Sequence, residues 1–230
     1  MPIPSLAFLI DVDNTLLDND TAKADEAAHL GDLLGEAAAS RFWDIYEEVR
    51  KQEGVVDYPL TLARFEQEVA GQFSRETLFH LSSYFLTFPF QTYVYPGALD
   101  TLAYLNTLGT TAITSDGDAT FQGLKIVRSG ISSAVDGRVA LYLHKEQHLA
   151  EIEAMFPADH YVMIEDKHTL LSAVKAQMGQ HLTTVLVRQG KYAHVAPAPG
   201  ALPPDLSVAS IADVQQLRRE QFLGQETSAR

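Results

Sequence analysis

Hydrophobic positions follow two different patterns along the chain, with the change at about residue 95. Between about residues 20 and 90, apolar side chains recur every three or four positions, which is the spacing of amphipathic helices. This spacing predicts four helices, at 22–34, 38–53, 60–73 and 75–85. We therefore expect a block of helices with no strand in this part of the chain.

Short apolar runs alternate with helical segments in the rest of the chain. One run lies at 6–10, ahead of the helical block. After residue 95 the pattern predicts strands at 110–114, 138–143, 160–164, 182–187 and 206–208, and helices at 98–108, 120–129, 146–156, 169–178 and 211–222. Such alternation is typical of a mostly parallel sheet with helices on both faces. The sequence therefore predicts a doubly wound α/β core formed by 1–18 and 93–230, with a small all-helical domain at 19–92 inserted into it.

Composition narrows the class of protein and its compartment. The 230 residues are 46% hydrophobic and 20% charged, which is enough for one large domain or for a domain with an insert. No run of eighteen apolar residues occurs, and the apolar start of the chain meets Asp11 too early for a signal-peptide core. We therefore expect a cytoplasmic protein without a membrane partner.

Charge and cysteine content limit the chemistry. The net charge of −13 argues against binding to a nucleic-acid backbone, and an anionic substrate would need a locally positive site. The chain has no cysteine, which excludes disulfides, a thiol nucleophile and thiolate ligands. Any metal ion must be held by oxygen or imidazole.

Two carboxylates follow the first predicted strand at alternate positions. Residues i and i+2 of a strand point to the same face, so Asp11 and the region of Asp13 address one small volume. Like charges this close repel each other unless a cation or a shared proton is present. The pattern favours a nucleophile or metal ligand followed by a general acid/base; the alternative is a pair of solvated turn carboxylates.

Polar residues also follow two later strands, and ligands of such sheets bind beyond the carboxyl ends of the strands. Ser115 and Asp116 lead into a helix, where a hydroxyl and free N–H groups can bind phosphate oxygens, although ordinary helix capping is the alternative. Glu165 and Asp166 follow the strand at 160–164. Carboxylates suit magnesium, although an acidic helix start is again the alternative.

Lysines are the candidates for local positive charge. Lys145 lies just before a helix, and its compact ammonium suits pairing with a carboxylate and a phosphoryl oxygen. We interpret Lys125, Lys167 and Lys175 as ordinary surface lysines.

Taken in order, these segments resemble the four motifs of the haloacid dehalogenase superfamily of hydrolases. The motifs are Asp11-Val12-Asp13-Asn14-Thr15, then Ser115, then Lys145, then Glu165-Asp166. The resemblance covers the chain from residue 6 to about 187. It implies that the helical block is a mobile cap and that Tyr95-Pro96-Gly97 marks the return to the core.

The resemblance also implies catalytic roles. Asp11 would attack phosphorus and form an aspartyl-phosphate, while Asp13 would protonate the leaving oxygen and then activate water. Ser115, Asp116 and Lys145 would bind the phosphoryl group, with Lys145 also counted among the catalytic residues.

A magnesium site follows from the same resemblance. Its ligands would be the carboxylates of Asp11 and Asp166 and the backbone carbonyl of Asp13. Leu170 and Leu171 occupy positions where many relatives carry another acid, so Glu165 would take over part of that role.

The function implied is magnesium-dependent hydrolysis of a small phosphorylated metabolite by a monomer or homodimer. Dehalogenation is disfavoured because displacement at carbon needs neither a metal nor an acid two residues after the nucleophile. A phosphotransferase or mutase of the same family, or a phosphate-binding protein without turnover, remains as an alternative.

Overall fold

The computed structural model describes residues 5–54, 56–117 and 119–224. Its core is a six-stranded sheet in the order β3-β2-β1-β4-β5-β6. The strands are β1 (Leu6–Ile10), β2 (Thr110–Asp116), β3 (Val139–Tyr142), β4 (His160–Glu165), β5 (Leu182–Val187) and β6 (Leu206–Val208). Every neighbouring pair is parallel, so the predicted α/β fold is confirmed and the described sheet is wholly parallel. The strand order reverses at β1, where such folds bind ligands.

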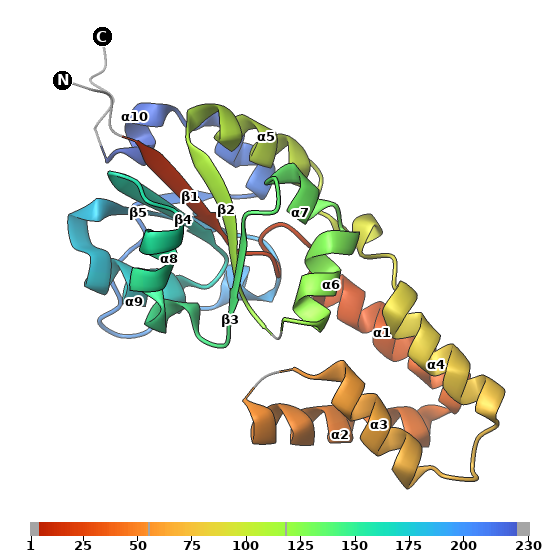
Figure 1. Cartoon of the computed structure of the whole chain (residues 1–230). Helices are drawn as coiled ribbons and strands as arrows, with labels where there is room; N and C mark the ends of the chain where they lie inside the picture. Colours follow the sequence, from red (N-terminus) through yellow and green to blue (C-terminus); the bar gives the residue numbers. More distant parts are fainter. Residues whose placement is uncertain (1–4, 55, 118, 225–230) are drawn as a thin grey trace.

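Helices cover both faces of this sheet (Figure 1). They are α5 (Ala98–Leu108), α6 (Phe121–Arg128), α7 (Ile131–Ala134), α8 (Leu149–Met155), α9 (His168–Met178) and α10 (Arg219–Phe222). Successive residues of a strand face opposite sides. Phe8 and Ile10 of β1 accordingly join the hydrophobic cluster that contains α5 and α10, whereas Ala7 and Leu9 join the cluster of α8 and α9.

Four further helices lie between β1 and β2 and extend away from the sheet (Figure 1). They are α1 (Asn19–Leu34), α2 (Glu36–Glu53), α3 (Tyr58–Glu68) and α4 (Arg75–Thr87). Buried aromatic rings hold this helical insert together: Phe42 of α2 stacks on Phe85 of α4 with centroids 5.4 Å apart, and Phe65 of α3 packs edge-on against Phe42.

The insert is joined to the sheet by two segments that run side by side. Leu17 and Val94 form an antiparallel bridge. The backbone N–H of Asp18 donates to the carbonyl of Tyr93 at 2.8 Å, and that of Tyr95 donates to Leu16 at 2.9 Å. Because this connection begins just after β1, the base of the insert lies at the carboxyl edge of the sheet.

Three short 3₁₀ segments complete the elements that bear on the site and on the C-terminus. They are η2 (Lys145–Gln147), η4 (Lys191–His194) and η5 (Ile211–Gln216); η1 (Phe90–Tyr93) and η3 (Gly179–His181) lie elsewhere. The predicted helix at 146–156 is therefore wrong at its start, because η2 precedes α8. No helix within the described ranges combines the length and hydropathy of a membrane crossing.

The single helix predicted at 211–222 is wrong. The chain forms η5, then an extended residue at Leu217, then α10. The hydroxyl of Tyr104 donates to the Leu217 carbonyl at 2.6 Å, and Ser210 and Asp213 cap η5 reciprocally. These contacts to α5 and within the turn outweigh the continuous helical periodicity of the sequence.

Candidate active site

Asp11 lies directly beyond β1, at the centre of the sheet's carboxyl edge. Its backbone N–H donates to the Ile164 carbonyl at 3.0 Å, which fixes it beside the end of β4. The residue is 3% exposed, and its Oδ2 accepts a hydrogen bond from Thr15 Oγ1 at 3.4 Å. Burial and the charge of Glu165 raise the pKa of Asp11 to about 6, although Lys145 opposes the shift.

Lys145 is fully buried at the start of η2, which follows β3. Its Nζ donates to Asp11 Oδ1 and Glu165 Oε2, both at 2.6 Å, and to the Thr114 carbonyl at 3.0 Å. An ammonium group has three donors, so these contacts use all of them. Burial alone would lower the pKa of Lys145, but the two carboxylates outweigh it and raise the pKa, which keeps the lysine charged.

Asp11, Glu165 and Asp166 form a buried acidic cluster whose ligand atoms lie within 4.8 Å of one another. Glu165 accepts from Lys145 and from the backbone N–H of Lys167 at 3.2 Å. Both oxygens of Asp166 are buried and have no hydrogen-bond donor among the described residues. Burial and the adjacent Glu165 raise the pKa of Asp166 to about 10. An all-oxygen set with an unpartnered buried carboxylate fits a hard divalent cation.

The Asp13 side chain lies apart from this cluster and faces α6. Its carboxylate forms an ion pair with Lys125, with Nζ 2.9 Å from Oδ1 and 3.1 Å from Oδ2, and Gln122 Nε2 lies 3.4 Å from Oδ1. Burial would raise the pKa of Asp13, but Lys125 outweighs it and lowers the pKa. Lys125 is 5% exposed and also donates to Asn19 Oδ1 at 3.0 Å, so its interpretation as a surface lysine is wrong.

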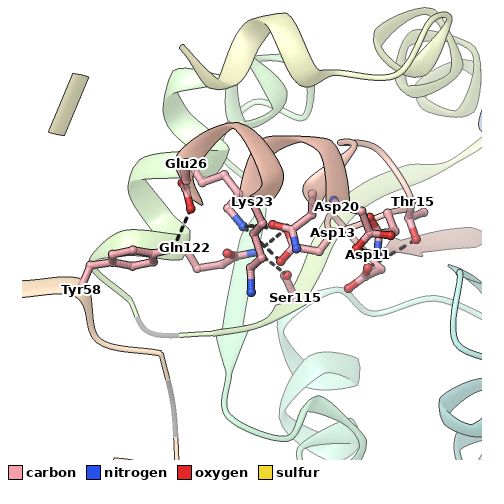
Figure 2. Close-up of polar contacts among 12 residues, drawn as sticks. Asp11, Asp13, Thr15, Asp20, Lys23, Glu26, Tyr58, Ser115 and Gln122 are labelled. Carbon is pink, nitrogen blue, oxygen red and sulfur yellow. Dashed lines mark hydrogen bonds and ion pairs between the residues drawn. The ribbon is translucent and has the colours of Figure 1, made fainter. Parts of the chain in front are cut away.

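The two predicted phosphate-binding residues of β2 have different surroundings. Ser115 is buried, and its Oγ accepts a hydrogen bond from Gln122 Nε2 at 3.0 Å (Figure 2). Asp116 Oδ1 instead accepts from the backbone N–H of Lys145 at 2.9 Å, so this carboxylate positions the lysine. Gly117, with φ +150°, lets the Gln122 side chain pack against the backbone that follows β2. A Cβ at residue 117 would lie only 2.7 Å from Gln122 Cβ.

A small cavity of about 70 Å³ opens beside Asp13, between the insert and α6. Its lining consists mainly of polar and aromatic side chains from both parts of the chain: Asp13, Asn19, Lys23, Glu26, Tyr46, Val56, Tyr58, Asp116, Gly117, Phe121, Gln122 and Lys125. The cavity therefore adjoins Asp13 and Asp116, the two site carboxylates that lie outside the acidic cluster.

The loop after β5 reinforces the first motif. Asn14 adopts φ +62°, a left-handed conformation that asparagine tolerates, and its side chain exchanges hydrogen bonds with Asp20 at 3.2 Å. Asp20 also accepts from the backbone N–H of Lys191 at 2.7 Å. Gly190 packs against Asn14 so closely that a Cβ would lie 2.6 Å from Asn14 Cβ.

Lys167 is a second lysine whose surface interpretation is wrong. It is partly buried, and the charges of Asp11 and Glu165 outweigh the effect of burial and raise its pKa. Lys167 therefore adds positive charge near the acidic cluster. Sequence reasoning also missed Gln122, whose amide links Ser115 to Asp13.

Comparison with known proteins gives matches among solved structures. A haloacid dehalogenase-like hydrolase of Burkholderia xenovorans LB400 is 41% identical over 94% of this chain and 98% of its own, with a TM-score of 0.83. An L-2-haloacid dehalogenase of Xanthobacter autotrophicus is 18% identical over 92% and 97%, with a TM-score of 0.57. A magnesium-bound HAD-hydrolase of Bacillus subtilis is 14% identical over 93% and 98%, with a TM-score of 0.58. No family model and no curated protein matches the chain.

Proposed function

The chain belongs to the haloacid dehalogenase-like hydrolases, and on this basis we propose that it hydrolyses small phosphate monoesters with Mg²⁺ through an aspartyl-phosphate on Asp11. The observation that carries the proposal is the buried trio Asp11, Glu165 and Asp166, in which Asp166 has no donor among the described residues. A carboxylate nucleophile beside a cation site, with a second acid at Asp13, suits phosphoryl transfer.

Asp11 and Asp166 would hold the magnesium ion, together with the backbone carbonyl of Asp13. Glu165, already bonded to Lys145, would support this site from beside it. The bound ion would offset the clustered negative charge and polarise the phosphoryl group.

In the first half of the reaction, a carboxylate oxygen of Asp11 attacks phosphorus and the bond from phosphorus to the ester oxygen breaks. Asp13 gives a proton to that oxygen, so the alcohol leaves neutral. Lys125 keeps Asp13 ionised in the free protein, so Asp13 would take up this proton when the anionic ester binds beside it and raises its pKa. Ser115 would donate to a phosphoryl oxygen, and the positive charge of Lys145, whose three donors are already used, would offset the negative charge of the phosphoryl group. Gln122 and Lys125 hold the Asp13 carboxylate in place through the contacts at 3.4 and 2.9 Å.

In the second half, Asp13 takes a proton from a water molecule as the water oxygen attacks phosphorus. The bond between Asp11 and phosphorus breaks, and inorganic phosphate and the free Asp11 carboxylate result. The proton that Asp13 takes from the water replaces the one it gave to the alcohol, so the net reaction consumes one water molecule per ester.

The helical insert would act as a cap over this edge of the sheet. Its two connecting segments meet at Leu17 and Val94, and Leu17 also forms a bridge with Asp13, so a small rotation there would open or close access to the site. A closed cap would exclude water while Asp11 is attacked.

Asp13 is also the residue that favours phosphate esters over haloacids. A halide ion leaves carbon without needing a proton, so a dehalogenase has no use for an acid at this position. The ion pair between Asp13 and Lys125 and the neighbouring cavity give this acid a defined place beside a leaving group.

The test is phosphate release from a panel of small phosphate esters, with Mg²⁺ or with chelator, by the wild type and by Asp11→Asn. We expect magnesium-dependent release that the substitution abolishes. Halide release from 2-chloropropionate, measured in parallel, would instead establish a dehalogenase. Transfer of phosphate to a sugar hydroxyl without release would indicate a mutase, and ester binding without either reaction would indicate a binding protein.

A further inference from the structure

Glu26 of α1 is a buried carboxylate that the proposed chemistry does not use. The residue is 2% exposed, and its Oε2 accepts a hydrogen bond from the Tyr58 hydroxyl at 2.8 Å (Figure 2). No cationic side chain of the described chain lies within ion-pair distance of it. Burial raises the pKa of Glu26, while the Tyr58 hydrogen bond and the charges of Lys125 and Lys23 oppose the shift.

Glu26 lies where it could contact a bound substrate. It lines the 70 Å³ cavity that also borders Asp13, and Lys23 lies three residues earlier on the same face of α1. Lys23 Nζ is 3.2 Å from the Tyr46 hydroxyl, which lines the same cavity. The cavity lining thus offers a hydrogen-bond acceptor at Glu26, and a cation and a hydroxyl group at Lys23 and Tyr46. A group bound beside Asp13 would lie in the same cavity.

We infer that this cavity is the leaving-group subsite, and that Glu26, Tyr58 and Lys23 select a short polyhydroxy alcohol on the phosphate ester. The inference rests on the proposed function, because it assumes that the ester oxygen leaves beside Asp13. One water-sized group needs roughly 10–15 Å³ of such a cavity. A cavity of about 70 Å³ therefore holds roughly five to seven such groups, which is about the size of a glycerol unit.

A hydroxyl group fits these walls better than the alternatives. Hydroxyls both donate and accept, so one can donate to Glu26 while another accepts from Lys23. An alkyl group would leave the buried carboxylate without a further partner, which is costly. An ammonium group would meet the charges of Lys23 and Lys125, the latter paired to Asp13, as well as that of Glu26.

The experiment compares kcat/KM for sn-glycerol 3-phosphate and n-propyl phosphate, which share three carbons and differ in two hydroxyls. We expect the wild type to prefer the polyol ester by about 100-fold or more, because a site built for hydroxyls rejects an analogue that lacks them. In Glu26→Gln, and to a smaller extent in Tyr58→Phe, this ratio should fall by about 10-fold or more. Glu36→Gln, the same change on an exposed position of α2, should leave the ratio as in the wild type.

Binding provides a second readout that does not depend on turnover. Calorimetry with the same two esters and Mg²⁺ on Asp11→Asn should show tighter binding of the polyol ester, and the added Glu26→Gln change should remove the difference. Hydrolysis of both esters at equal rates, or preference for 2-aminoethyl phosphate, would overturn the subsite while leaving the proposed function intact. Selective binding with no hydrolysis would overturn the proposed function and keep the subsite.

Discussion

Replacing Asp11 by asparagine should make the protein more stable when no divalent cation is present. The folded protein buries Asp11 beside Glu165, which raises the pKa from 3.8 to about 6. A carboxyl group with a raised pKa contributes stability that is complete below its unfolded value and is lost as the pH rises through the folded value. Asparagine resembles the neutral carboxyl group, so it avoids this loss at neutral pH.

The size of the effect follows from the shift. At 1.36 kcal/mol for each pKa unit, a rise of about two units costs the folded state about 3 kcal/mol at pH 7.5. Because Asp11 is only 3% exposed, solvent screens little of this cost. At pH 5, where Asp11 is largely protonated in the folded protein, the same linkage predicts a gain in stability about half as large. Lys145 keeps Glu165 and the Thr114 carbonyl as partners in the variant.

The assay is urea unfolding of the wild type, Asp11→Asn and the control Asp44→Asn, in chelator, at pH 7.5 and pH 5. Asp44 is exposed on α2, so its substitution should change the free energy of unfolding by less than about 0.5 kcal/mol. Added Mg²⁺ should stabilise the wild type more than Asp11→Asn, because an ion that binds only the folded state stabilises it. An Asp11→Asn protein that is less stable than the wild type at pH 7.5, or a difference that does not shrink at pH 5, would refute the reasoning.

Four other substitutions test the remaining contacts. Lys145→Met should lower the free energy of unfolding, measured by urea unfolding, by about 3–5 kcal/mol, because it leaves two buried carboxylates without their shared cation. A loss below about 1 kcal/mol would contradict this. Asp166→Asn should weaken Mg²⁺ binding at least about 10-fold by calorimetry, and unchanged affinity would exclude it as a ligand. Gly190→Ala should cost about 1–3 kcal/mol in thermal unfolding, because its φ is +67° and the new Cβ would collide with Asn14. Glu26→Gln should raise stability more at pH 8 than at pH 5.5, because the raised pKa of the glutamate makes its ionised form costly; the opposite trend would contradict the burial argument.

The acidic cluster could be predicted because strand order and strand direction decide it. Asp11 and Asp166 each follow a short apolar run, and parallel strands bring their carboxyl ends to one edge. The register, with Ile10 opposite Ile164, then places the residues that follow side by side. Lys145 follows β3, so its position in space depends on where this edge strand lies. Its place in the order of the motifs nevertheless predicted a lysine that pairs with a carboxylate, and it contacts Asp11 and Glu165.

The surroundings of Asp13 could not be predicted from the order of motifs. Its partners Gln122 and Lys125 lie on α6, on the face shared with Phe121 and Ile126, which are buried. A glutamine and a lysine at core positions of an amphipathic helix were the available signal, because polar residues there need buried partners. Which partners they have depends on how α6 packs beside the insert, and no local pattern contains that information.

Buried charges in this protein separate into those with internal partners and those without. Lys145 and Lys125 are buried and have carboxylate partners at 2.6–3.1 Å, so their charges are compensated by the fold itself. Asp166 and Glu26 are buried as deeply, at 1% and 2% exposure, but neither forms an ion pair with a described residue, and burial raises both pKa values. A fold that keeps such carboxylates gives up stability at those positions, which is expected where a ligand completes the interaction. The same argument therefore supports the proposals of a cation at Asp166, in the acidic cluster with Asp11, and of substrate hydroxyls at Glu26, in the cavity beside Asp13.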